Sequence, residues 1–243
     1  MNVETSLGRI RTQLSGMERM VRILRAEIES QISEVAPGDL DRLSEIPSGL
    51  GALFREAQPM TAQAVDPYKH FAKGVWIGMD QEVGATGATV GLKALGTGQG
   101  HGRGNGRGVA RLSVNPVFPL VEKPRWVTLE TTLDVAALKS AQGLRVDTVS
   151  FFEIGAGNAA QMPRSVTLTL RLHRKGGKAT DHLDYRVPVS TMPFEHSARF
   201  GAAAMAELAL EDVTEALMIL ELPLAGIYAL KLDHFAVMAV EGG

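Results

Sequence analysis

The sequence predicts a mainly β protein, an antiparallel β-sandwich preceded by an N-terminal coiled-coil helix. Within the first 36 residues, apolar side chains recur at the three- and four-residue spacing of a heptad repeat. From about residue 109 the apolar period changes to two, the period of half-buried strands. Turn signals separate these strands at short intervals, which is typical of an antiparallel sandwich.

The helix is expected over residues 6–36, ending before Pro37-Gly38, because proline cannot continue a helix. Its a and d positions are Leu7, Ile10, Leu14, Met17, Val21, Leu24 and Ile28. Met20 and Ile32 widen this apolar stripe, which favours three helices over two. We therefore expect a homo-oligomer, with a trimer favoured. The alternative is an amphipathic helix folded back onto its own domain.

Residues 37–108 are expected to form an irregular, proline- and glycine-rich linker region with one short helix. Ten of the 25 residues from 84 to 108 are glycine, and this density raises the entropy cost of ordering the chain. The expectation is a flexible surface loop. The alternative is a loop whose bare backbone lies against a ligand, a capsid surface or a symmetry mate, with contacts from His101, Arg103 and Arg107.

The β-sandwich domain is expected over residues 109–243. Leu168, Leu170 and Leu172 alternate with polar residues, and the same alternation runs from Trp126 to Val135. Lys175-Gly176-Gly177-Lys178 predicts a two-residue hairpin turn, because both central glycines adopt positive φ readily. The expected strands, besides the one around residues 126–135, are 109–114, 144–154, 165–174, 180–189, 216–222 and 227–240. Residues 202–210 fit either a helix or a strand.

Composition excludes several classes of function. The chain has no cysteine, so it has no disulfide, thiolate metal site or cysteine nucleophile. A net charge of −2 gives no electrostatic case for nucleic acid, and no stretch is long and apolar enough to span a membrane. The first residues lack the basic start of a secretory signal. No motif of an enzyme, a cofactor or a metal site is recognised, so we expect a protein that is not an enzyme and holds neither metal nor cofactor.

The candidate glycan-binding residues are one tryptophan and the polar groups expected to face outward near it. A tryptophan on the polar side of a strand can stack on a sugar ring and donate from its N–H group. Charged and imidazole groups can bond sugar hydroxyls; a solvated strand face is their alternative role. These residues are Trp126, Arg125, Glu130, Arg171 and His173.

The order of parts resembles fibre and head-spike proteins of tailed phages and of phage-like gene transfer agents. That order is a heptad helix, a glycine-rich connector and a cysteine-free sandwich. The pattern of two strand segments also resembles that of carbohydrate-binding sandwich modules. These segments are Trp126-Val-Thr-Leu-Glu-Thr-Thr-Leu-Asp and Leu168-Thr-Leu-Arg-Leu-His173. The resemblance implies a particle-borne protein, made in the cytoplasm without a signal peptide, that recognises capsular polysaccharide.

These observations lead to one hypothesis and two alternatives. The hypothesis is an oligomeric spike or fibre subunit of a virion or phage-like particle that binds cell-surface polysaccharide through its sandwich, an adhesion role. The first alternative is a purely structural virion or connector protein that binds capsid or tail subunits. The second is a polysaccharide-degrading enzyme, with unrecognised carboxylates or His173 as its catalytic groups.

Overall fold

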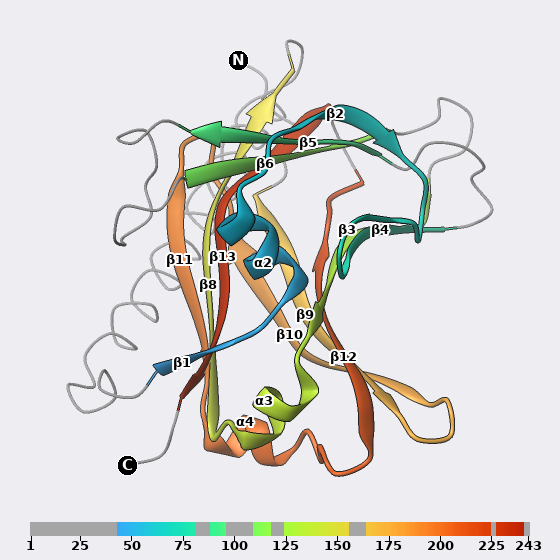
Figure 1. The fold of residues 1–243 in the computed structure, drawn as a ribbon, viewed down its shortest axis with the longest axis vertical. Coiled ribbons are helices and arrows are strands. Elements are labelled where there is room, and N and C mark those ends of the chain that lie inside the picture. Colours follow the sequence, from blue (N-terminus) through green and yellow to red (C-terminus); the bar gives the residue numbers. More distant parts are fainter. Residues whose placement is uncertain are drawn as a thin grey trace, which may run out of the picture. The chain divides into compact units, whose positions relative to one another are not determined.

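The computed structural model describes residues 43–80, 88–95, 109–117, 124–155, 164–224 and 227–240. All of them belong to one compact unit, residues 42–243 (Figure 1). The coiled coil predicted for residues 1–36 lies outside the described residues, and so does the run of alternating glycines from 96 to 108.

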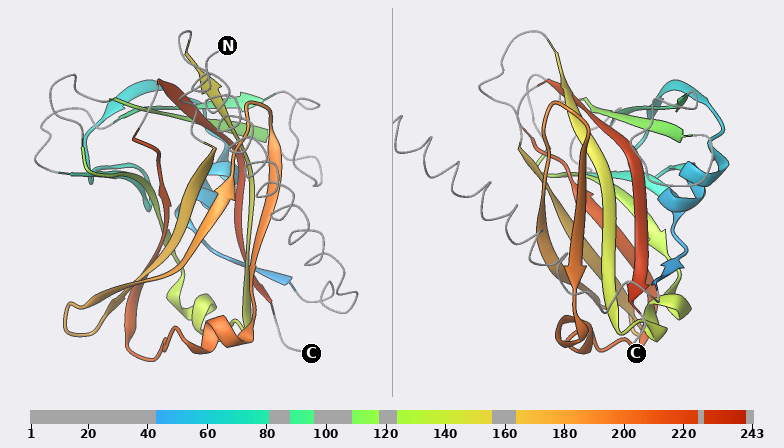
Figure 2. Two further views of the ribbon diagram at one scale, coloured as in Figure 1. Left: turned by 180° about the vertical axis from the view of Figure 1, so that it is seen from behind. Right: turned by 90° about the vertical axis from the view of Figure 1, so that its left-hand side faces the viewer.

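Two antiparallel sheets build this unit (Figures 1 and 2). The first is seven-stranded, in the order β11-β8-β13-β6-β5-β2, with β1 also paired to β13. Its strands are β1 (Leu43–Ile46), β2 (Met60–Val65), β5 (Ala88–Leu95), β6 (Val109–Pro116), β8 (Gly143–Ile154), β11 (Phe194–Phe200) and β13 (Tyr228–Val240). The second is six-stranded, in the order β10-β9-β12-β7-β4-β3. Its strands are β3 (His70–Ala72), β4 (Val75–Met79), β7 (Val127–Leu133), β9 (Ser165–Arg174), β10 (Ala179–Pro188) and β12 (Val213–Glu221).

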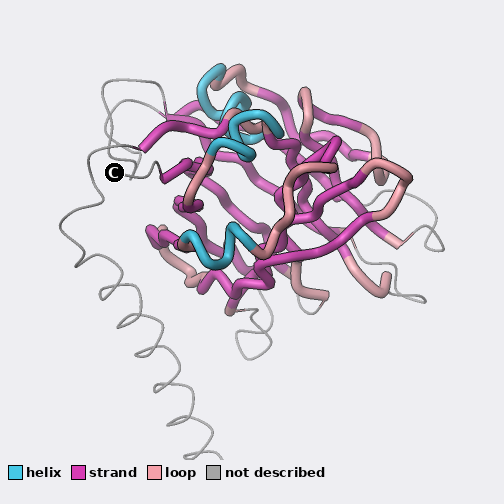
Figure 3. Tube along the Cα trace, turned by 90° about the horizontal axis from the view of Figure 1, so that it is seen from below, coloured by secondary structure: helices cyan, strands magenta, loops and turns pink. Residues whose placement is uncertain are grey.

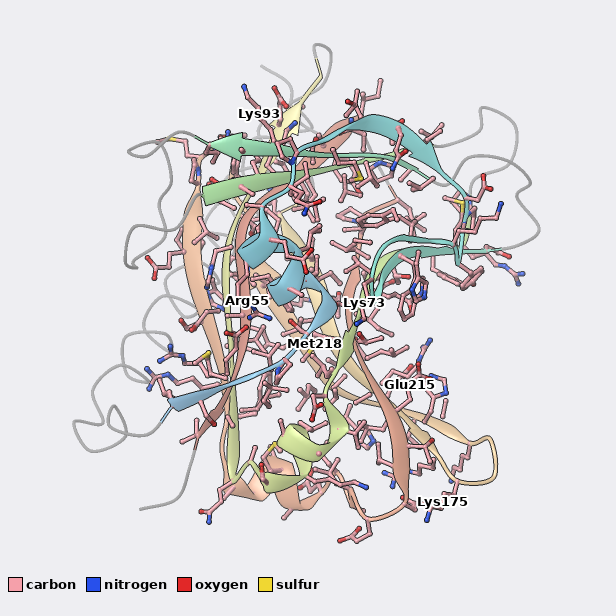
Figure 4. All side chains as sticks on the ribbon, in the orientation of Figure 1. Arg55, Lys73, Lys93, Lys175, Glu215 and Met218 are labelled. Carbon is pink, nitrogen blue, oxygen red and sulfur yellow. The ribbon has the colours of Figure 1, made fainter. Side chains whose placement is uncertain are left out.

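The two sheets enclose one apolar core, as the period-two pattern predicts. Val166, Leu168, Leu170 and Leu172 of β9 are buried, and the residues between them are only partly covered. On β12, Met218 lies in the interior, whereas Glu215 lies on the outside (Figure 4). The antiparallel β-sandwich expected from the sequence is therefore confirmed for this unit.

The predicted hairpin between β9 and β10 is confirmed, although its turn contains three residues, Lys175, Gly176 and Gly177, instead of the predicted two. Gly176 and Gly177 have φ values of 91° and 82°, which a residue with a side chain rarely adopts. Two backbone hydrogen bonds close the turn. The Gly177 amide donates to the Arg174 carbonyl at 3.1 Å, and the Arg174 amide donates to the Lys178 carbonyl at 2.8 Å. The turn joins β9 to β10 at the predicted place.

The sandwich begins earlier in the sequence than predicted. The region expected to be an irregular linker contains β1 to β5, which belong to the two sheets. Alternation does not mark these strands. All five residues of β4 are buried, so neither face of the strand carries a run of polar residues. Most residues of β2 are exposed, so neither face of the strand carries a run of apolar residues. Residues 88–95, predicted to lie in a glycine-rich loop, form β5.

Two short helices cross between the sheets at one end of the sandwich (Figure 3). α3 (Val135–Ser140) connects β7 to β8, and α4 (Ala202–Ala206) connects β11 to β12. Leu138, Met205 and Leu208 bury their side chains there and join the core. The ambiguous segment 202–210 is therefore helical in its first half, where alanine favours a helix.

A third helix connects the sheets along one edge. α2 (Gly49–Glu56) starts at Ser48, whose side chain accepts a hydrogen bond from the Gly51 amide. Ser48 pairs with Leu133 of the six-stranded sheet, while β1, just before it, pairs with β13 of the other sheet. Gly49 packs directly on the backbone of Gly74, where a Cβ would meet the Gly74 carbonyl oxygen. Only glycine permits this approach.

We predict that Gly49→Ala destabilises the sandwich by about 1–3 kcal/mol, because the obstructing atoms are backbone and cannot turn aside. Gly201→Ala is the matched control. It also lies at the start of a helix, but no atom within 4 Å would meet its Cβ, and we expect a change below about 0.5 kcal/mol. Chemical denaturation measures both. Equal losses for the two variants would contradict this account of the packing at Gly49.

The other edge is joined by a tyrosine–histidine contact. Tyr185 of β10 and His196 of β11 belong to different sheets, and the tyrosine hydroxyl lies 3.0 Å from His196 Nε2. The two rings are stacked, and the ring of Phe194 also stacks with this histidine. Burial lowers the pKa of His196 below its ordinary 6.5, and Asp147 opposes that shift only in part. The neutral imidazole therefore belongs to the folded state.

We predict that the free energy of unfolding falls as the pH drops through about 6.5, because the unfolded chain then binds a proton that buried His196 resists. This contribution is complete above the unfolded pKa and is lost as the pH approaches the lower, folded pKa. His196→Gln keeps a hydrogen-bonding group at this position but removes the titration. Denaturation at about pH 7.5 and 5.5 should show a smaller pH effect in the variant. An identical pH effect in both proteins would rule out His196 as its source.

Candidate functional site

The candidate site lies on the face of the six-stranded sheet that points away from the seven-stranded one. Here the strand register places outward-facing side chains of β4, β7, β12 and β9 in rows. We call this surface the Glu130 face. Its members are Trp76, Gly78, Thr128, Glu130, Leu217, Ile219 and Arg171.

Glu130 is the central residue of this face. It pairs with Trp76 on one side and with Ile219 on the other. Although it faces outward, only 4% of it is exposed. The Thr128 hydroxyl donates to Glu130 Oε1 at 2.6 Å. A Cβ at Gly78 would meet both oxygens of this contact, so the bare glycine backbone provides the space that the carboxylate occupies.

The second carboxylate oxygen of Glu130 remains available. Within the described residues, Oε2 accepts no hydrogen bond, and Glu130 forms no ion pair. Buried carboxylates are normally hydrogen-bonded, because desolvating a charge is costly. Oε2 is not among the fully enclosed side-chain atoms that lack a partner. This oxygen therefore keeps some solvent-accessible area.

An apolar patch surrounds this carboxylate. Trp76, Leu217 and Ile219 form a cluster separate from the main core and are 8%, 4% and 4% exposed. The imidazole of His70 lies flat on the Trp76 ring, with centroids 4.7 Å apart and an interplanar angle of 7°. Aromatic and aliphatic area beside a hydrogen-bonding group is what a ligand with both apolar and polar surface requires.

A second aromatic pair lies at one end of the face. Tyr68 and Trp126 meet edge to face, with centroids 6.3 Å apart. The Tyr68 hydroxyl donates to the Met79 carbonyl at 2.9 Å, and the residue remains 41% exposed. Burial of part of the side chain raises the pKa of Tyr68, and the negative charge of Glu130 raises it further. That electrostatic effect indicates that the pair and the carboxylate are near each other.

Each of two arginines of this region is engaged by an aspartate. Arg171 of β9 binds Asp181 of β10 through two parallel hydrogen bonds of 2.7 and 2.8 Å. The guanidinium holds the pKa of Asp181 below its usual value. Arg125 Nε donates to Asp80 Oδ2 at 2.6 Å. Bidentate pairing fixes the plane of the Arg171 guanidinium, leaving its remaining N–H groups in defined directions.

The structure brings four of the five predicted residues to one region. Glu130 and Arg171 share the face. Arg125 and Trp126 come directly before the start of β7, at one end of the face. Trp126 was expected on the strand itself, but it lies just before the strand and is half-buried. His173 also faces outward, one row beyond Arg171 and opposite Glu215. It is therefore the most peripheral of the five.

Sequence reasoning missed Trp76, His70, Tyr68 and Gly78. Their region was expected to be a linker, so no strand face was considered for them. The segment Gly74-Val75-Trp76-Ile77-Gly78 carried the one available signal, a tryptophan flanked by glycines. The carboxylate expected to be solvated is buried instead, because Gly78 gives it room on the neighbouring strand.

The described residues contain no group of three side chains suited to hold a metal ion. Among them there is also no helix long and apolar enough to cross a membrane. The site consists of hydrogen-bonding groups, paired charges and aromatic surface.

No protein-family model and no curated protein sequence matches this chain. Among solved structures, it is similar to one described as CBM4 (9% identity, 77% of this chain and 97% of that one covered, TM-score 0.46). It is also similar to the CBM22-1 xylan-binding domain of Paenibacillus barcinonensis Xyn10C (11%, 77% and 97%, TM-score 0.39). A third is the Stig cyclase Fisc from Fischerella sp. TAU, in complex with a pyrrolidinylidene indole (17%, 83% and 100%, TM-score 0.47). None of these similarities assigns a ligand or an activity to this chain.

We predict that Gly78→Ala is folded and costs about 1 kcal/mol, less than Gly49→Ala, because it meets side-chain ends rather than backbone. The displaced Glu130 carboxylate should change the environment of Trp76, its partner across the strands. Denaturation measures the cost, and tryptophan fluorescence reports the rearrangement. A loss of stability as large as that of Gly49→Ala would show that Glu130 cannot move aside.

Proposed function

We propose that this protein binds polysaccharide through the Glu130 face. The observation that carries the proposal is the Oε2 atom of Glu130, a carboxylate oxygen in a largely buried position with no hydrogen bond of its own within the described residues. It adjoins the apolar patch around Trp76. A sugar ring presents hydroxyl donors at its edge and C–H groups on its face, and these match an acceptor beside an aromatic surface.

The proposed role is binding rather than catalysis. Thr128 and Gly78 hold Glu130 in place, and Asp181 holds Arg171. Side chains fixed in this way need little reordering when a ligand arrives, which favours affinity. The face offers an acceptor and oriented donors, and the Tyr68–Trp126 pair at its end offers aromatic surface; these functions retain a ligand without altering its covalent bonds.

We further propose that the chain is an oligomeric spike or fibre subunit of a virion or phage-like particle. The heptad repeat of residues 1–36 supports oligomerisation, with a trimer favoured, and capsid or tail proteins would be its partners in the particle. Capsular polysaccharide at the surface of a recipient cell would be its ligand. Linking several weak sites raises their effective concentration on a repetitive polymer.

We predict that the full-length protein binds immobilised capsular polysaccharide and that Arg171→Ala weakens binding about tenfold or more, because it removes oriented donors from the face. Arg145→Ala is the matched control. Arg145 is likewise paired to an aspartate, Asp147, but belongs to the seven-stranded sheet. The affinity of the Arg145→Ala variant for the polysaccharide should stay within about twofold of the wild-type affinity. Equal losses for both variants, with both proteins folded, would place the binding surface elsewhere.

Removal of residues 1–36 should leave the intrinsic affinity for a short soluble oligosaccharide unchanged and weaken retention on the immobilised polymer by about 100-fold. Light scattering of both proteins supplies the oligomeric state. Unchanged retention on the polymer would contradict the multivalent spike, although polysaccharide binding by the sandwich would stand.

A further inference from the structure

The charges around Glu130 indicate which class of polysaccharide, neutral, acidic or amine-bearing, the face would bind. Of the two arginines in this region, Arg171 is bound by Asp181 and Arg125 by Asp80. The Arg171–Asp181 pair is close to neutral as a unit. The charge of Glu130 has no such partner, since no described cation forms an ion pair with it. Among the described residues, the carboxylate at the centre of the face therefore has no ion-pair partner.

The neighbouring strand adds to this negative charge. β12 lies beside β7, and its outward-facing polar residues are Glu215 and Glu221, both exposed. Neither forms an ion pair with another described residue. Two outward-facing basic groups of the sheet, Arg186 of β10 and His173 of β9, form no ion pair with another described residue, and the imidazole of His70 of β3 stacks on Trp76. A ligand crossing the β7–β12 part of the face thus meets carboxylates, and the guanidinium on this face, Arg171, is held by Asp181.

A burial effect strengthens this charge preference. Coulomb interactions are several times stronger in a partly dehydrated site than in water. A uronate or sulfate placed against Glu130 would be repelled. A neutral hydroxyl would gain one ordinary hydrogen bond. A protonated amine would form a charge-assisted hydrogen bond with Oε2, roughly twice as strong as a neutral one.

The aromatic groups favour the same ligand. Trp76 lies directly beside Glu130 in the strand register, and Tyr68 is near enough for its pKa to respond to the Glu130 charge. The faces of such rings attract cations as well as the C–H face of a sugar. An amine held by the carboxylate would therefore have aromatic neighbours on the same face.

We propose that the ligand of the Glu130 face is a glycan with free amino groups, and that Glu130 Oε2 accepts a hydrogen bond from one of its ammonium groups. This inference rests on the proposed polysaccharide binding and refines it. It requires that amine-bearing glycans bind more tightly than neutral ones of the same backbone and that acidic glycans bind least.

The test uses the full-length protein and glucosamine oligomers of one length, fully deacetylated or fully N-acetylated, with a neutral glucan oligomer and a polyuronate oligomer as further probes. Calorimetric titration at about pH 6, where most amines are protonated, gives the four affinities. We expect the deacetylated oligomer to bind at least about tenfold tighter than the other three. Glu130→Gln should remove that preference.

Glu153→Gln is the control for a nonspecific charge effect. Glu153 is an exposed glutamate of β8, in the other sheet, where it pairs with Lys231. This variant should keep the full preference for the amine. Equal or tighter binding of the neutral, acetylated or acidic oligomer would overturn the amine inference and leave polysaccharide binding in place. Absence of binding to all four oligomers and to capsular polysaccharide would overturn both.

Discussion

The alternation of β7 is the constraint on which both the core and the candidate site depend. Val127, Leu129 and Leu133 of this strand enter the apolar core between the sheets. The same pleat must then direct Thr128 and Glu130 to the opposite face, because successive side chains of a strand point in opposite directions. A register slip of one residue would bury the glutamate in the core, and the large cost of an unpaired buried charge opposes that slip.

The neighbouring strands bury the outward-facing side chain of Glu130. β4 contributes Gly78, which gives the carboxylate room, and Trp76, which shields it on one side. β12 contributes Ile219 on the other side. The position of β4 in turn depends on contacts outside the sheet, since Gly74, just before it, packs against Gly49 of α2. The edge segment that holds the two sheets together therefore also positions the site.

The sequence predicted the parts of the fold in which one face is apolar and the other polar. β9, the glycine turn after it and β10 follow from period-two alternation and from two residues with positive φ. β4 was not predicted, because it is buried on both faces and carries no alternation. The coiled coil remains a prediction, since it lies outside the described residues.

The site could be predicted only in part, for a related reason. Glu130 and Arg171 were chosen as outward-facing polar residues, and the strand register does place both on one face. The burial of Glu130 could not be foreseen, because it depends on a glycine 52 positions earlier that only strand pairing brings beside it. The stack of His70 on Trp76 depends on a short hairpin that a single sequence does not reveal.

The most direct test of the central claim uses the chain's two tryptophans, Trp76 and Trp126, as reporters. Trp76 belongs to the Glu130 face, and Trp126 lies at its end. The measurement is a titration of ¹⁵N-labelled protein with an oligosaccharide that binds it, following the two indole N–H signals. If polysaccharide occupies this face, the Trp76 signal shifts in proportion to the bound fraction, and the Trp126 signal shifts for ligands long enough to reach it. Saturable binding that leaves both signals unchanged would contradict the assignment of the Glu130 face as the binding surface.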